Sequence, residues 1–140
     1  MNNNENLLEV LEKSDENIIN DSTAAMSRFR LKHYDGDVNK FHAKIALLFE
    51  HVVRGVREKS VMPMVSYVEQ IAEQRFYSGF DLQEVQTAFN ILEEHIWKYI
   101  LEDVPLGSQA EALSLISSIV GSGKDALART FYQLAITSKN

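Results

Sequence analysis

Apolar side chains recur every three or four positions along most of this chain, which is the spacing of one face of an α-helix. The clearest segment is 38–59, in which one continuous stripe contains Val38, Phe41, Ile45, Leu48, Val52 and Val56. The same spacing predicts helices over residues 5–33, 63–78 and 81–104. With only two prolines and six glycines in 140 residues, long helices are favoured over short strands. The prediction is an all-α fold, an antiparallel bundle of four to five helices.

Boundary residues mark several ends of these predicted helices. Residues 34–37 form a predicted turn, and Gly79 is placed for a left-handed C-cap. Asp81 and Glu84 have the spacing of a capping box at the start of the next helix. In the first segment polar residues interrupt the apolar stripe, which predicts a bend or break near residues 14–20.

The last segment contains a Gly-Ser-Gly sequence at residues 121–123. Each glycine inside a helix costs about 1 kcal/mol relative to alanine. The apolar stripe nevertheless stays in phase across the glycines, because Ile116 and Leu127 are eleven residues apart, close to three helical turns. This spacing favours one long, kinked C-terminal helix over two shorter helices, and it makes Gly121 and Gly123 the candidate hinge.

Charge and composition narrow the class of protein. The formal net charge is −6. Glu50 and Glu58 dilute the one concentration of basic residues, which comprises Lys40, Lys44, Arg54, Arg57 and Lys59. This group is expected to form a solvated helix face, and a nucleic-acid partner is not expected. The absence of cysteine excludes disulfides and thiolate chemistry. The longest apolar run, 45–49, is far shorter than the roughly 20 residues of a membrane span, and the N-terminus lacks a secretion signal. We expect one cytoplasmic domain over residues 1–140, without membrane contact.

The residues that could carry chemistry are not assembled into a recognisable site. No histidine has a glutamate three residues before it, and no two histidines are four residues apart, so neither helical metal motif is present. No serine is matched with a base, and the Gly123–Lys124 step lacks the rest of a phosphate loop. We therefore predict no catalytic residue, no metal ligand and no cofactor.

Aromatic side chains are concentrated in the third and fourth predicted helices. Core packing is the simplest role for them, and a small-molecule pocket or a dimer seam is the alternative, because aromatic residues are enriched at interfaces. Trp97 falls about a quarter turn from the buried stripe, which makes it the first candidate for a residue that faces a partner. The candidate pocket or interface residues are Trp97, His95, Phe89, Tyr99, Phe76 and Arg75.

The central segment resembles a known family of helical domains. Residues 72–85 are AEQRFYSGFDLQEV, and residues 88–97 are AFNILEEHIW. This arrangement of an arginine, three residues, a glycine, an apolar residue, and then a Leu and a Glu that open a helix resembles the RsbT co-antagonist RsbRD N-terminal domain family. Glu93 and Glu94 stand where family members often have an arginine.

The resemblance implies a sensory or regulatory input domain, because members of this family occur at the front of stress-signalling proteins and sensor histidine kinases. The hypothesis is a non-catalytic homodimer in the N-terminal part of a longer protein. It senses an unknown small ligand or a partner and relays the signal through its last helix to a downstream output domain. Two alternatives stay open: a histidine phosphotransfer bundle that uses His95 or His42, and a globin-like haem sensor that uses His95 or His51.

Overall fold

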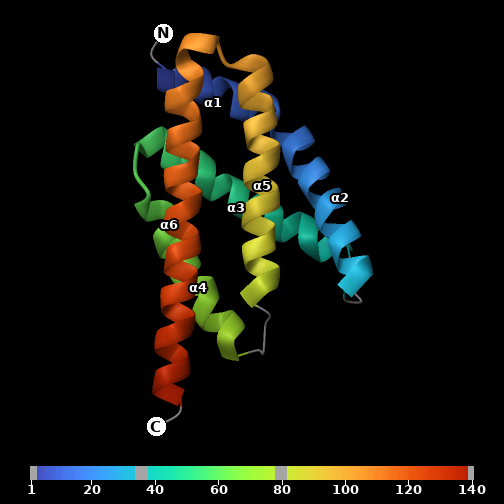
Figure 1. Ribbon diagram of the computed structural model, residues 1–140, viewed down its shortest axis with the longest axis vertical. Helices are drawn as coiled ribbons and strands as arrows, with labels where there is room; N and C mark the ends of the chain where they lie inside the picture. Colours follow the sequence, from blue (N-terminus) through green and yellow to red (C-terminus); the bar gives the residue numbers. More distant parts are fainter. Residues whose placement is uncertain (1–2, 34–37, 78–81, 139–140) are drawn as a thin grey trace.

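The computed structural model describes residues 3–33, 38–77 and 82–138, which form six helices and contain no strand. They are α1 (Asn3–Lys13), α2 (Asp15–His33), α3 (Val38–Glu58), α4 (Met62–Tyr77), α5 (Leu82–Asp103) and α6 (Leu106–Ser138), and Figure 1 shows their arrangement. The predicted all-α bundle is confirmed. The predicted turn at 34–37 and the predicted caps at Gly79 and Asp81 lie outside the described residues.

The first predicted helix is divided at Ser14 into α1 and α2, and the described residues therefore form six helices where four to five were expected. Ser14 N donates to Val10 O at 3.0 Å, and Ile18 N donates to Ser14 O at 2.9 Å, so helical hydrogen bonding continues across the division. The chain changes direction there: α1 lies across the top of the molecule in Figure 1, and α2 descends. This change lets α1 contact α6 while α2 packs on α3 and α5.

Helices α4, α5 and α6 follow the long axis of the molecule, and α3 crosses them (Figure 1). Figure 1 also shows that α5 is antiparallel to α6. In contrast, α4 runs parallel to α6. Met64, near the start of α4, fills the space beside Gly123, and further along both helices Phe76 contacts Phe131. The bundle is therefore not purely antiparallel. Its helices α4 and α6 are parallel, and α3 lies across the others.

The core consists of the stripes that the periodicity predicts. Every one of the six helices contributes completely buried apolar side chains, and their removal from water is the main force that holds the helices together. The largest of them include Leu7, Leu11, Ile18, Ile45, Met64, Phe89, Leu92, Ile96, Ile100, Ile116 and Ile119. Within residues 3–33, 38–77 and 82–138, no helix has the length and apolar character needed to cross a membrane.

A tight connection fixes the end of α3 and the start of α4. Lys59 has a φ of 52°, and Ser60 N donates to Gly55 O at 3.0 Å, which is the hydrogen bond of a Schellman motif. Ser60 Oγ then accepts a hydrogen bond from Met62 N at 3.0 Å and caps α4. Ser60 therefore closes α3 with its backbone N–H and begins α4 with its side chain, and the first turn of α4 is held close to α3.

Candidate functional site

The six candidate residues from the sequence lie in different surroundings. Phe89 is completely buried against α6, and Phe76 packs edge-on against Phe131 with 5.7 Å between the ring centroids. Trp97 is 37% exposed on the outer side of α5. The remaining three, His95, Tyr99 and Arg75, are partly buried. A role in binding stays a prediction for all six, and of these six residues Arg75 is the one that lines the cavity described below.

Two histidines use one ring nitrogen to bond their own helix. His95 Nδ1 lies 2.8 Å from Ile91 O, and His51 Nδ1 lies 2.8 Å from Leu47 O. A carbonyl oxygen only accepts, so Nδ1 carries the hydrogen in both rings. The Nε2 atom of each ring takes no part in this hydrogen bond. In the part of the chain that the structure describes, no three His, Asp or Glu side chains are close enough to hold a metal ion.

An internal cavity of about 40 Å³ lies between α2, α3, α4 and α5. At roughly 10–15 Å³ for each water, it has room for about three water-sized groups. Most of its wall is apolar, formed by Met26, Phe41, Ile45, Leu48, Ile71, Val85 and Ala88. Its polar wall consists of Lys44, Tyr67, Arg75 and Glu84. Apolar walls with a few convergent polar groups are also typical of small-molecule sites, which usually measure about 300–1,000 Å³.

The polar wall of this cavity contains a buried carboxylate. Glu84 is only 4% exposed, and a carboxylate in such surroundings is costly unless charges or hydrogen bonds compensate it. Lys44 and Arg75 line the same cavity, and all three side chains have hydrogen-bond or electrostatic partners within the chain. Two cationic side chains and one acidic side chain therefore line the same small space.

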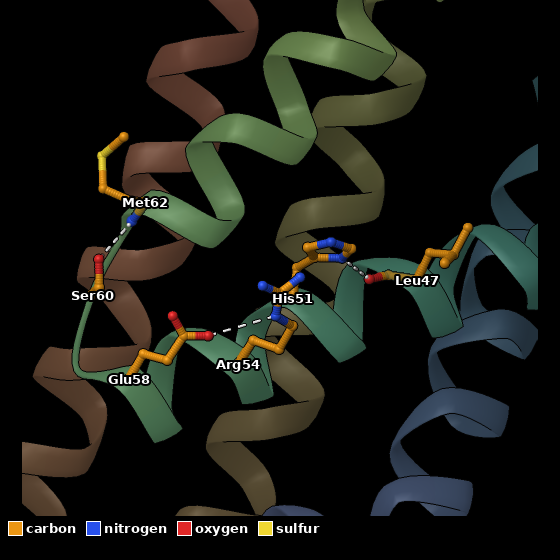
Figure 2. Close-up of polar contacts among 6 residues, drawn as sticks. All are labelled: Leu47, His51, Arg54, Glu58, Ser60 and Met62. Carbon is orange, nitrogen blue, oxygen red and sulfur yellow. Dashed lines mark hydrogen bonds and ion pairs between the residues drawn. The ribbon is translucent and has the colours of Figure 1, made fainter.

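An open groove on the surface shares Tyr67 with the internal cavity. We call this groove, of about 380 Å³, the α3–α4 groove; its lining includes His51, Arg54, Ser60, Tyr67 and Gln70. The rings of Tyr67 and His51 are stacked with 4.0 Å between centroids and an angle of 14°. Figure 2 shows His51 beside Arg54 on α3, and the Nε atom of Arg54 lies 3.6 Å from Glu58 Oε2. Of this stacked pair, Tyr67 lines both spaces and His51 is in the lining of the groove.

Burial raises the pKa of the Tyr67 phenol above its ordinary value of 10.0. The nearby Arg75 guanidinium opposes this rise, and the Glu50 carboxylate adds to it. The neutral phenol is thus the form that the folded protein prefers. Because the folded-state pKa is the higher one, this preference stabilises the fold below pH 10 and is lost as the pH rises through the folded-state pKa.

The two glycines of the candidate hinge have opposite surroundings within the uninterrupted helix α6. A Cβ atom at Gly123 would lie 2.9 Å from Met64 Cγ and 3.1 Å from the ring of Phe89, so this glycine allows α4 and α5 to approach α6 closely. A Cβ atom at Gly121 would have no heavy atom within 4 Å. The hinge itself stays a prediction, and close packing is the role that the contacts give to Gly123.

Sequence reasoning missed two polar residues of the internal cavity. Lys44 belongs to a group that was expected to form a solvated helix face, yet it is partly buried at the cavity. Glu84 was expected to serve the capping box, and it lies in the cavity wall. The available signal was the position of each residue next to the buried stripe: Lys44 lies three residues after Phe41, and Glu84 precedes Val85.

These features define the class of the protein as an all-α bundle with a small cavity among its helices. The family described as the RsbT co-antagonist protein rsbRD N-terminal domain matches residues 21–131, and the chain belongs to this family. The resemblance seen in the central segment is therefore confirmed, and the chain is a regulatory domain of the stress-signalling type. Among curated proteins and solved structures, none matches the chain significantly.

Alanine at each glycine should change stability in opposite directions. Gly121→Ala gains about 1 kcal/mol of helix propensity and meets no neighbour, so the free energy of unfolding should rise. Gly123→Ala gains the same propensity but overpacks the contact with Met64 and Phe89, at a cost of about 1–3 kcal/mol. The free energy of unfolding of this variant should therefore fall. Urea denaturation of both variants measures the difference. Equal stability of the two variants would contradict the packing role of Gly123.

Tyr67 should ionise at a higher pH than the exposed tyrosines. The near-ultraviolet absorbance of tyrosinate measures this titration, and Tyr67→Phe should remove a component that titrates above pH 10. The matched control is Tyr132→Phe, because Tyr132 is largely exposed on α6. Thermal unfolding at alkaline pH should show a smaller loss of stability in Tyr67→Phe than in the parent protein. Removal of the same component by both substitutions would count against a buried Tyr67.

Proposed function

We propose that this chain is the non-catalytic sensory input domain of a bacterial stress-signalling protein, and that it relays through α6 to an output module. The observation that supports the relay is the reach of α6, a single helix of 33 residues and thus about 50 Å long. It contacts α1, α3, α4 and α5, so a repacking of these helices changes the position of α6 relative to them. A rigid helix transmits such a change along its whole length.

The C-terminal part of α6 supports a connection to something beyond the bundle. In Figure 1 this helix extends past the ends of α4 and α5. Phe131 still packs against Phe76, whereas Tyr132 and Ile136, one turn apart on one face, are exposed. An exposed apolar pair on the protruding end of a helix suits contact with an output module, for which a histidine kinase is one candidate.

The homodimer is part of the proposal, with a seam on the outer face of α5. Asn90, Glu94, Trp97 and Leu101 recur at helical spacing and are all exposed on this face. Lys124 Nζ donates to Asn90 Oδ1 at 2.9 Å, so the face borders α6. Trp97 and Leu101 give it an apolar centre, and tryptophan is enriched among residues that dominate interfaces. The proposed location is the cytoplasm.

Insertions at the end of α6 test the relay in the full-length gene product. Two alanines after Ser138 turn the following segment by about 200°, whereas seven turn it by about 700°, close to the original direction. We expect the two-residue insertion to change the output of a stress-response reporter strongly and the seven-residue insertion to restore it. Equal output from both variants would contradict relay through α6, as would the lack of an output module after this helix.

Substitution of Trp97 tests the dimer. Trp97→Ala removes the largest exposed apolar side chain of the proposed seam, so it should weaken self-association by at least about tenfold, as for a typical interface hot spot. Analytical ultracentrifugation over a range of concentrations measures the dissociation constant. Leu47→Ala is the matched control, because Leu47 is a similarly exposed apolar residue on α3. A monomeric parent protein, or an equal effect of the two substitutions, would exclude this seam.

A further inference from the structure

Helix α2 presents a partly polar face to its neighbours α3 and α5. Among residues 15–29, whose side chains the structure describes, two apolar side chains are buried, Ile18 and Met26. The same face buries two hydroxyl side chains, since Ser22 is 0% exposed and Thr23 is 6% exposed. The shorter helix α1 buries three apolar side chains. Because apolar burial is the main force that holds the helices together, α2 is docked weakly for its length.

The buried hydroxyls of α2 do not tie this helix to its neighbours in the described part of the chain. Thr23 Oγ1 donates to Ile19 O at 2.7 Å, which is a bond within α2. One turn further on, Ser27 Oγ donates to Thr23 O at 2.9 Å. Ser22 Oγ is buried and has no hydrogen-bond partner among the described residues. A hydroxyl that is buried without a partner is less stable there than in water, so the docked position of α2 includes a cost that undocking removes.

Helix α1, in contrast, is held to α3 by polar contacts as well as by apolar ones. Asn4 Nδ2 donates to Val56 O at 2.9 Å, and Arg57 Nη2 donates to Glu12 Oε1 at 3.2 Å. The change of direction at Ser14 therefore separates a helix that is bonded to α3 from a helix that is docked mainly through two apolar side chains. An undocking of α2 can begin at this division while α1 stays in place.

Helix α2 covers one side of the internal cavity. Met26 is its contribution to the wall, and the wall opposite includes Ile45 and Leu48 of α3 and Val85 of α5. In Figure 1, α2 lies at the edge of the molecule, and α5 lies between it and α6. Undocking of α2 would expose this apolar wall to solvent, and the contacts of α6 with α3, α4 and α5 would remain.

We propose that α2 is a releasable cover, which undocks from α3 and α5 as a unit while α1 and α3–α6 stay folded. The unsatisfied hydroxyl of Ser22 brings the docked and undocked states closer in free energy. The inference deepens the proposed sensory function and rests on it for its role in signalling: the signal changes the population of the undocked state, for which it must have a different affinity.

Native-state hydrogen exchange of the whole chain, followed by NMR at low urea concentrations, tests the separate opening. We expect the amides of residues 18–29 to exchange together, faster than the slowest amides of α6 and with a weaker dependence on urea, because a partial opening exposes less surface than global unfolding. Exchange of these amides with the same opening free energy and urea dependence as the slowest amides of α6 would show that α2 opens only when the whole domain unfolds. That result would overturn the proposal.

Substitution of Ser22 tests the cause of the weak docking. Ser22→Ala removes the unsatisfied hydroxyl, so it should slow the exchange of the α2 amides by about tenfold. Asn20→Ala is the matched control, because Asn20 is exposed on α2 and this substitution gains a similar helix propensity. It should slow the same amides by no more than about threefold. Equal effects of the two substitutions would remove the role of the Ser22 hydroxyl and contradict the proposal.

Substitution of Gly121 separates the two kinds of opening. Gly121→Ala stabilises α6, which stays folded when α2 undocks. It should therefore slow the slowest α6 amides by about fivefold and leave the α2 amides unchanged. An equal slowing in both helices would mean that they open together, and the proposal would be wrong.

The outcomes separate this inference from the proposed function. If α2 opens only with global unfolding while the insertions after Ser138 still alter output with helical phase, the releasable cover is wrong and the relay stands. If α2 opens separately and the insertions have no phase dependence, the cover stands and relay through α6 is wrong. If Ser22→Ala slows the opening but leaves the output of the stress-response reporter unchanged, the opening has no part in signalling.

Discussion

The close approach of three helices to α6 is the constraint on which the rest of this structure depends. Two positions without a Cβ atom permit it: Gly55 of α3, where a Cβ would lie 2.9 Å from Ile119 Cδ1, and Gly123 of α6, where it would lie 2.9 Å from Met64 Cγ. At ordinary helix separations of 8–10 Å, side chains fill the space between the axes. Here the backbone itself is part of the contact. The position of α6 is therefore tied to the crossing of α3 and to the packing of α4 and α5.

The local periodicity of the sequence was sufficient to predict the helices and their buried faces. The stripe over 38–59 became the buried side of α3, and the in-phase stripe around residues 121–123 became one continuous α6. The division at Ser14 was predicted only as a bend or break over a range, because helical hydrogen bonds pass through it and no glycine or proline marks it. The parallel pairing of α4 with α6 depends on the direction of α3. The apolar pattern of a single helix does not indicate the direction of another helix.

The candidate site was less predictable for a related physical reason. Periodicity indicates which side of a helix faces inward, and it does not indicate which side chains of other helices meet there. Arg75 was singled out by the sequence and does line the internal cavity, whereas Lys44 and Glu84 were assigned surface and capping roles. Gly121 and Gly123 looked equivalent as helix breakers, yet one faces open space and the other a packed contact. Only the contacts between segments that are far apart in the sequence distinguish the two glycines and identify the residues that line the cavity.

Tight packing also determines how a change at the cavity would act on α6. A ligand shifts a conformational equilibrium only if its affinity differs between the two states. Ala88 and Phe89 are consecutive on α5, with the first at the cavity and the second against Gly123. A displacement of α5 at the cavity would also move the Phe89 ring that packs at Gly123. If α6 followed this ring, its exposed end with Tyr132 and Ile136 would move as well.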